Sequence, residues 1–147
     1  MADKYRAADS ESIAAGATET ILMITAPADS RPRILGLAVS CLDYTSADGA
    51  MTIKLQKATT TGTSSALTPI PTDEAAPATD VVAAKDFTVE PTLTTEYFKR
   101  IIPMQALGEW QFTEDEQIMV VSGRVAVVVT NPTGGARTFQ AELLFRD

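Results

Sequence analysis

The sequence contains no histidine and a single cysteine, and these two absences exclude the commonest catalytic and metal sites. Nucleophilic systems of the Ser-His-Asp and Cys-His types need an imidazole, and so does the commonest zinc ligand set. The one cysteine, Cys41, cannot form an internal disulfide. It lies in the apolar run 35–42, so we expect a small buried side chain rather than a reactive thiol.

Basic clusters and long apolar runs are also missing. The chain has 12 Lys and Arg residues, which are scattered, and its net charge is −7. Nucleic-acid binding depends on cations that neutralise phosphates, and anionic membranes repel an acidic surface, so we expect neither partner. No apolar run approaches the roughly 20 residues that span a bilayer, and no signal-peptide core follows the N-terminus. We therefore expect a soluble protein made in the cytoplasm.

The sequence does contain a series of short strand patterns separated by turn residues. Apolar side chains of one parity occupy positions 125, 127 and 129, and the same alternation recurs over 139–145. The turn residues at 131–135 lie between these two runs, which predicts a C-terminal hairpin buried on one face. Two further runs, 33–44 and 51–57, flank Asp48-Gly49 and predict another hairpin.

The number and spacing of these runs predict the fold class. About eight to ten short strands in one chain are typical of an all-β, single-domain antiparallel β-sandwich that is jelly-roll-like. Residues 1–17 are polar and alanine-rich and predict an N-terminal arm with at most one edge strand, so the sandwich domain would be 18–147. Residues 58–79 are rich in Thr, Ala and Pro and predict a long irregular loop. That loop either contacts a partner or crosses the surface passively.

Side chains suited to catalysis are few. The acidic runs 114–116 and 73–74 lie in turn-like segments, where solvated charge is the ordinary use. Paired-carboxylate catalysis and a bound calcium ion are the alternatives for them. We expect no catalytic, metal-binding or cofactor-binding residue, and therefore no enzyme.

The aromatic residues are the better candidates for a binding site. We expect Tyr97, Trp110 and Phe112 to be anchors of a partner interface, where aromatic side chains are enriched. Core packing is the main alternative for Trp110, and a sugar-stacking platform is another. Tyr97 and Phe98 are consecutive, so on a strand one would face the core and the other the surface.

Four segments together resemble a known family: 33–40 (Arg-Ile-Leu-Gly-Leu-Ala-Val-Ser), 61–65 (Thr-Gly-Thr-Ser-Ser), 109–112 (Glu-Trp-Gln-Phe) and 123–124 (Gly-Arg). Their order resembles small virion proteins of tailed bacteriophages and prophages, in particular capsid decoration, or cement, proteins. The resemblance covers about residues 20–145. It implies a jelly-roll-like domain and a non-enzymatic structural role, without a cofactor.

The resemblance also implies a partner and a location. Such proteins bind the outside of an assembled head, often as homotrimers, and clamp the lattice of the major capsid protein. The expected location is therefore the capsid surface of a virion, after synthesis in the host cytoplasm. A tail, head-fibre or receptor-binding component of the same fold, or a carbohydrate-binding β-sandwich module, are the alternatives.

Overall fold

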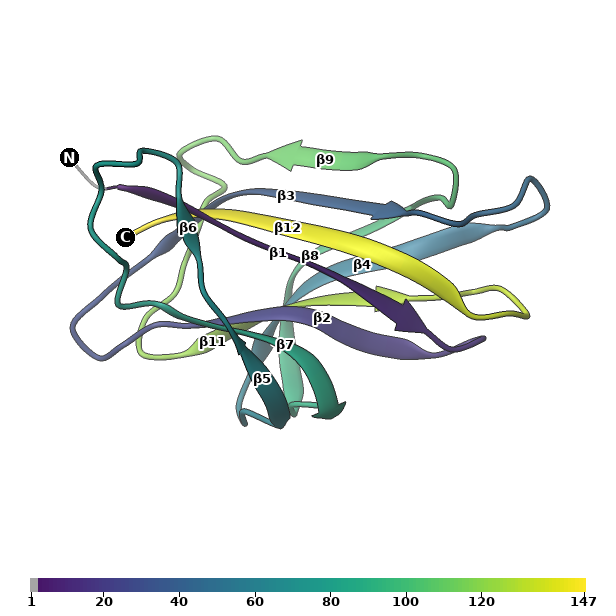
Figure 1. The fold of residues 1–147 in the computed structure, drawn as a ribbon, viewed down its shortest axis with the longest axis horizontal. Coiled ribbons are helices and arrows are strands. Elements are labelled where there is room, and N and C mark those ends of the chain that lie inside the picture. The colour runs from purple at the N-terminus through teal and green to yellow at the C-terminus, as the bar shows by residue number, and fades with distance from the viewer. Residues whose placement is uncertain (1–2) are drawn as a thin grey trace.

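The computed structural model describes residues 3–147, which form two antiparallel six-stranded sheets packed face to face (Figure 1). The first sheet contains β1 (Lys4–Ile13), β3 (Arg33–Cys41), β6 (Ile70–Pro71), β9 (Gly108–Gln111), β10 (Ile118–Met119) and β12 (Arg137–Arg146). The second contains β2 (Thr18–Thr25), β4 (Ala50–Ala58), β5 (Thr63–Leu67), β7 (Val82–Val89), β8 (Leu93–Pro103) and β11 (Arg124–Thr130). The described residues include no helix, so the prediction of an all-β sandwich is confirmed, with twelve strands.

The strands pair in a nested order. The first long strand pairs with the last (β1 with β12), β2 with β11, β3 with β9, and β4 with β8, all antiparallel. Consecutive strands from β1 to β4 alternate between the two sheets, and so do β8 and β9. The strands β5, β6 and β7, inserted between β4 and β8, extend the sheets at the edges next to β2 and β1.

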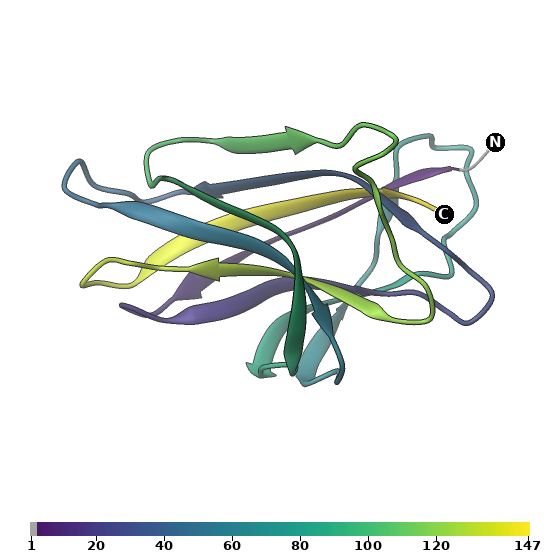
Figure 2. The ribbon, with the colours of Figure 1, turned by 180° about the vertical axis from the view of Figure 1, so that it is seen from behind.

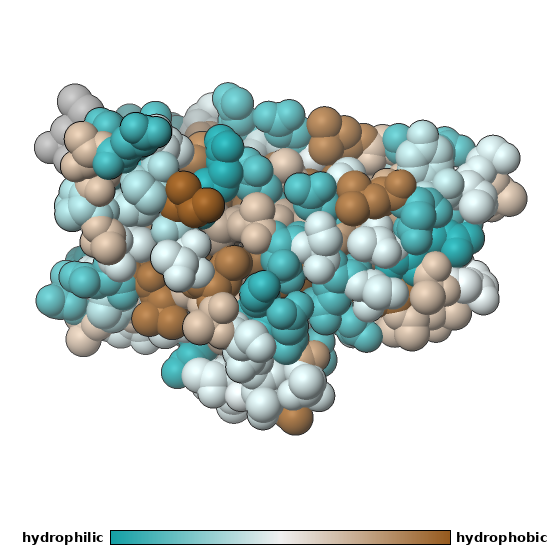
Figure 3. Space-filling view, in the orientation of Figure 1, coloured by the Kyte–Doolittle hydropathy of each residue, from teal (hydrophilic) through white to brown (hydrophobic). Residues whose placement is uncertain are grey.

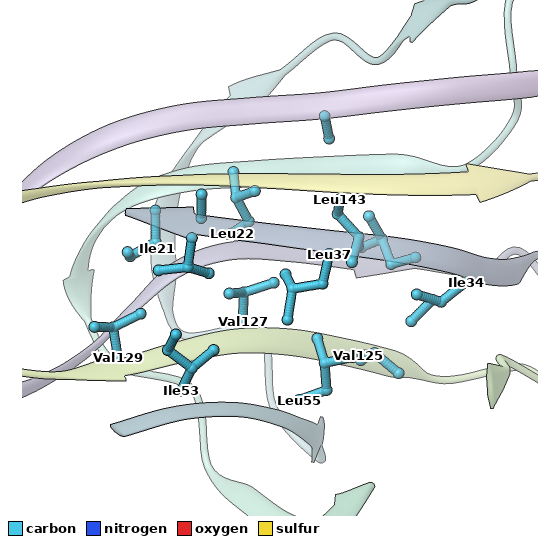
Figure 4. Packing of buried hydrophobic residues seen from close by; sticks show 14 of the residues in the cluster. Ile21, Leu22, Ile34, Leu37, Ile53, Leu55, Val125, Val127, Val129 and Leu143 are labelled. Carbon is cyan, nitrogen blue, oxygen red and sulfur yellow. The ribbon is translucent and has the colours of Figure 1, made fainter. Parts of the chain in front are cut away.

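The core lies between the sheets and is built from the alternating positions that the sequence predicted. The valines of one parity on β11 (Val125, Val127 and Val129) are all buried, as are Phe139 and Phe145 on β12. Figure 4 shows the valines from β11 facing leucine and isoleucine side chains from both sheets. Cys41 is buried at the end of β3, which confirms the prediction of a small buried side chain.

Two predicted hairpins are wrong. The segments 33–44 and 51–57 do form strands, but β3 pairs with β9, β10 and β12, whereas β4 pairs with β8 and β11. Likewise β11 and β12 are consecutive but lie in different sheets. The turn residues reverse the chain as expected, yet each reversal carries it across the sandwich to the opposite sheet.

Two predicted segment boundaries are also corrected. Residues 4–13 of the predicted N-terminal arm form β1, which pairs with β12 over ten residue pairs and contributes Tyr5, Ala7 and Ile13 to the core. Residues 1–2 lie outside the described residues. The predicted irregular loop at 58–79 contains β5 and β6 and passes from an edge of the second sheet to an edge of the first. Small residues and short runs weakened the alternation of apolar and polar residues by which these strands could have been recognised in the sequence.

Candidate functional site

The structure brings Tyr97, Trp110 and Phe112 to one pocket of about 480 Å³. Tyr97 lies on β8, an edge strand of the second sheet, Trp110 lies on β9 at the edge of the first, and Phe112 directly follows β9. The pocket therefore opens along one side of the sandwich, between the edges of the two sheets. Figure 2 turns this side toward the viewer, with β8 in dark green crossing the front.

Phe98 is the centre of the aromatic cluster, although sequence analysis did not select it as a site residue. Its ring centroid lies 5.2 Å from that of Trp110 and 5.3 Å from that of Phe112, with interplanar angles of 66° and 78°. These are edge-to-face contacts, the geometry that the ring quadrupoles favour. The guanidinium carbon of Arg100 lies 4.4 Å from the Phe98 centroid, a cation–π contact. The cluster thus holds a cation at the rim of an aromatic pocket.

A β-bulge exposes Tyr97. Leu55 pairs with Phe98, and the next residue of β4, Gln56, pairs with Glu96, so Tyr97 is the extra residue on β8. Bulges redirect side chains at sheet edges. Phe98 packs against the core, whereas Tyr97 remains 43% exposed. Its exposure is compatible with the predicted role as an interface anchor, which stays a prediction.

Trp110 and Phe112 are half-buried and pack against the main core, so the core-packing alternative for Trp110 describes part of its environment. The absence of a side chain at Gly108 makes room for the indole. A Cβ on Gly108 would lie 2.4 Å from Cη2 of Trp110 and 2.7 Å from Cδ1 of Ile102. Gly108 therefore fixes where the indole lies in the pocket.

Replacing Gly108 with alanine should move the indole out of its place. We expect a loss of about 1 kcal/mol in the free energy of unfolding, at the low end for overpacking because the ring can shift toward solvent. The emission maximum of the only tryptophan should move to longer wavelength. Urea unfolding and emission spectra measure both effects. Gly134→Ala is the control, because nothing lies within 4 Å of its added Cβ; an unchanged spectrum for Gly108→Ala would contradict the packing described.

The charged residues around the pocket include both signs, but its carboxylates already have partners. Glu96 forms an ion pair with Lys54 at 2.5 Å, and this hydrogen bond lowers the pKa of Glu96. Glu116 accepts hydrogen bonds from the backbone N and Oγ1 of Thr113, at 3.2 and 3.0 Å. The pocket is suited to binding through stacking, shape and charge.

The two acidic runs act as turn-stabilising groups. Besides the Glu116 contacts, Asp73 accepts a hydrogen bond of 2.9 Å from the backbone N of Ala75. Across residues 3–147, no three or more Asp, Glu or Cys side chains are arranged to hold a metal ion. The Cys41 thiol has its pKa raised by burial, which disfavours the thiolate.

The structure also contains a cluster of carboxylates that was not predicted from the sequence. Five carboxylates, from Asp9, Glu11, Glu19, Asp86 and Glu90, gather where β1 of the first sheet meets β2 and β7 of the second. They come from segments separated by up to about 80 residues, so no local pattern could reveal them. We name these five residues the carboxylate cluster.

The described residues contain no helix long and apolar enough to cross a membrane. No protein-family model, curated protein or solved structure matches the chain.

Proposed function

We propose that the protein is a non-enzymatic structural component of a tailed-phage virion, which binds the outside of the assembled head and stabilises the capsid lattice. The observation that carries this proposal is an aromatic pocket beside a long edge strand. Among the described residues, β8 pairs only with β4, so its eleven residues offer their other backbone edge to a partner. A large protein surface can use both features, through added strand pairing and aromatic anchors.

We also infer a jelly-roll arrangement for the sandwich. Its support is the nested pairing of β1 with β12, β2 with β11, β3 with β9 and β4 with β8. An antiparallel hairpin rolled into two four-stranded sheets pairs its strands in this order. The fold class agrees with the sequence resemblance to decoration proteins, and we carry over from that resemblance a homotrimer on the virion surface.

Binding only the assembled shell would stabilise it by mass action. A protein that binds the assembled lattice and not the free subunits shifts the equilibrium toward assembly, without turnover or a cofactor. Many identical sites on one shell make modest affinity at each site sufficient. This mechanism needs only a rigid domain and a contact surface.

The test is sedimentation of the purified protein with empty expanded heads of the phage that encodes it, and with unexpanded precursor shells. We expect saturable binding to expanded shells at a fixed ratio to the capsid subunit, and added resistance of those shells to heat. Light scattering of the free protein measures the trimer. Absence of binding to either shell would overturn the proposal and leave a tail, head-fibre or receptor-binding component as the alternative.

One observation favours a second candidate, a carbohydrate-binding module. The pocket volume of about 480 Å³ lies within the usual range for small-molecule sites. Its walls combine aromatic rings with Gln111 and the carboxylates of Glu96 and Glu116, which suit stacking on a sugar ring and hydrogen bonds to hydroxyls. Because the only tryptophan lies in this pocket, titration with soluble glycans should change its fluorescence if this function is correct.

A further inference from the structure

We propose that the partner contacts the protein through one cationic surface centred on Tyr97, and that the contacting segment of the partner is an acidic, extended polypeptide. The inference rests on the proposed function, because it names the surface and the partner chemistry of the same site. The surface, which we call the Tyr97 surface, comprises seven residues: Lys57, Tyr97, Lys99, Arg100, Met119, Val121 and Arg124.

Two hollows meet at Tyr97. One is the aromatic pocket, and the other is a hollow of about 200 Å³ between β8 and the start of β11. Tyr97 lines both hollows, and Met119 and Val121 line the second. These three apolar side chains are 43%, 40% and 53% exposed. Other large apolar side chains, such as Ile70 and Val82, are exposed elsewhere on residues 3–147, so this surface is distinguished by three apolar side chains that border two adjoining hollows.

Figure 3 shows another side of the molecule. The face of the sandwich that carries β1, β6 and β12 is largely hydrophilic or neutral, and several groups of hydrophobic atoms interrupt it, mainly in the left half of the view. Scattered apolar side chains on a surface need no partner, whereas adjacent ones that border hollows indicate contact. The apolar side chains of the Tyr97 surface border two hollows and therefore indicate contact with a partner.

The charge of the Tyr97 surface is opposite to that of the whole chain. The two hollows are lined by four cationic side chains, Lys57, Lys99, Arg100 and Arg124, and by only two carboxylates, Glu96 and Glu116. This cationic excess belongs to a chain of net charge −7. Electrostatic complementarity therefore favours an acidic partner at this surface and disfavours a basic one.

The cations retain unused binding capacity. Among the described residues, Lys57 and Lys99 have no ion-pair or side-chain hydrogen-bond partner, while Glu96 is paired with Lys54. The Nε of Arg124 also lacks a hydrogen-bond partner within residues 3–147, but it is shielded from solvent, so the two lysine ammonium groups are the donors open to a partner. Carboxylates are the acceptors that match lysine and arginine best.

The backbone of β8 explains why the partner segment should be extended. β8 is an edge strand of eleven residues whose second edge has no strand partner in the described chain. Lysines and bulges on edge strands act against indiscriminate pairing, and β8 carries Lys99, Arg100 and the bulge at Tyr97. A strand with acidic side chains at matching positions would satisfy the backbone and relieve the positive charge together.

A hollow elsewhere on the surface has the opposite character. It lies next to both ends of the described chain and is lined by Asp3, Asp29, Asp80 and Asp147, with Arg31 as its only cation. An acidic segment would be repelled there. The cationic Tyr97 surface and this acidic hollow together give the protein an electrostatic orientation toward an acidic partner.

The test compares two double charge reversals with the same change in net charge. K57E/K99E reverses two exposed lysines of the Tyr97 surface, and K4E/R31E reverses two exposed cations that line neither of the two hollows at Tyr97. Both spare Arg100, whose contact with Phe98 supports the fold locally. Thermal unfolding confirms that both variants are folded before binding is measured.

Binding is measured by sedimentation with expanded heads and by fluorescence titration of Trp110 with two synthetic peptides, acetyl-(Asp-Val)4-amide and acetyl-(Lys-Val)4-amide. We expect K57E/K99E to weaken binding to heads and to the acidic peptide at least tenfold, while K4E/R31E stays within twofold of wild type. The basic peptide should not bind. Added salt should weaken the wild-type interaction.

The outcomes separate this inference from the proposed function. If wild type and K57E/K99E bind heads equally, the Tyr97 surface is overturned while the decoration role stands. If wild type does not bind heads but binds the acidic peptide in a way that K57E/K99E abolishes, the decoration role is overturned and the surface stands. Equal binding of the acidic and basic peptides would overturn the proposed partner chemistry.

Discussion

Replacing Asn131 with alanine should lower the free energy of unfolding by at least about 3 kcal/mol, because one buried amide satisfies several backbone groups. Asn131 is 0% exposed. Its Nδ2 donates to the carbonyl oxygens of Ile13 at 2.9 Å, Ala14 at 3.2 Å and Gly135 at 2.9 Å. Its Oδ1 accepts from the backbone N and Oγ1 of Thr133, at 3.0 and 2.8 Å. Alanine would leave these groups without that partner.

The position of Asn131 in the fold explains why the loss is large. It directly follows β11 and ties the β11–β12 connection to the β1–β2 connection, so it joins two chain reversals far apart in sequence. Urea unfolding followed by circular dichroism measures the effect. Gln140→Ala removes an exposed side chain from β12 and should change stability by no more than about 0.5 kcal/mol. A loss below about 1 kcal/mol for Asn131→Ala would contradict the role described.

The strands themselves could be predicted well from the sequence, because burial on one face imposes a period of two. Val125, Val127 and Val129 are examples, and all three are buried against the opposite sheet. The N-terminal segment was expected to contain at most one edge strand, and β1 was not recognised as a core strand because its inward positions include the small Ala7 and the charged Asp9 and Glu11. Period alone therefore detects strands whose inward side chains are consistently apolar.

Strand pairing could not be predicted, because a turn signal fixes a reversal and not the sheet to which the chain returns. The loop between β3 and β4 shows this. The carboxylate of Asp48 accepts from the backbone N of Thr45 at 2.8 Å and from Arg137 on β12 at 3.0 and 3.1 Å. The Arg137 hydrogen bond is the largest cause that lowers the pKa of Asp48 to about 2. Asp48 thus anchors an arch between sheets, through a residue 89 positions away.

The candidate site was predictable in part. Tyr97, Trp110 and Phe112 could be selected because large aromatic residues are scarce in this chain, and the fold places all three at one pocket. The central position of Phe98 and the steric role of Gly108 depend on how β8 and β9 approach each other across the sandwich. No spacing within either segment contains that information.

The second prediction with a large effect concerns pH, and it arises from Glu11 in the carboxylate cluster. Glu11 lies on β1 with the inward parity, and its Oε2 is shielded from solvent without a hydrogen-bond partner in the described chain. Burial is the main cause that raises its pKa to about 7, and the carboxylates of Glu19, Asp86 and Glu90 add to the rise. The folded state therefore keeps a proton that the unfolded chain releases near pH 4.5.

The sign of the pH effect follows from proton binding. Between pH 4.5 and about 7 the folded state binds more protons at Glu11 than the unfolded state, so stability falls as the pH rises. The cost is absent below pH 4.5 and complete above about pH 7. The shift corresponds to about 3 kcal/mol, and access of water to part of the side chain reduces the expected cost to about 2 kcal/mol.

Replacing Glu11 with glutamine removes this charge and keeps the shape of the side chain. We expect Glu11→Gln to match wild type near pH 4.5 and to be more stable by about 2 kcal/mol at pH 8, with the difference growing between these values. Urea unfolding at several pH values measures the difference, and Glu74→Gln, on an exposed turn, is the matched control substitution. The other four carboxylates of the cluster remain in the variant. Among them, burial raises the pKa of Asp9, although the Nζ of Lys85 lies 3.9 Å from its carboxylate. A Glu11→Gln difference that is constant across this pH range would show that the carboxyl group does not titrate as the structure indicates.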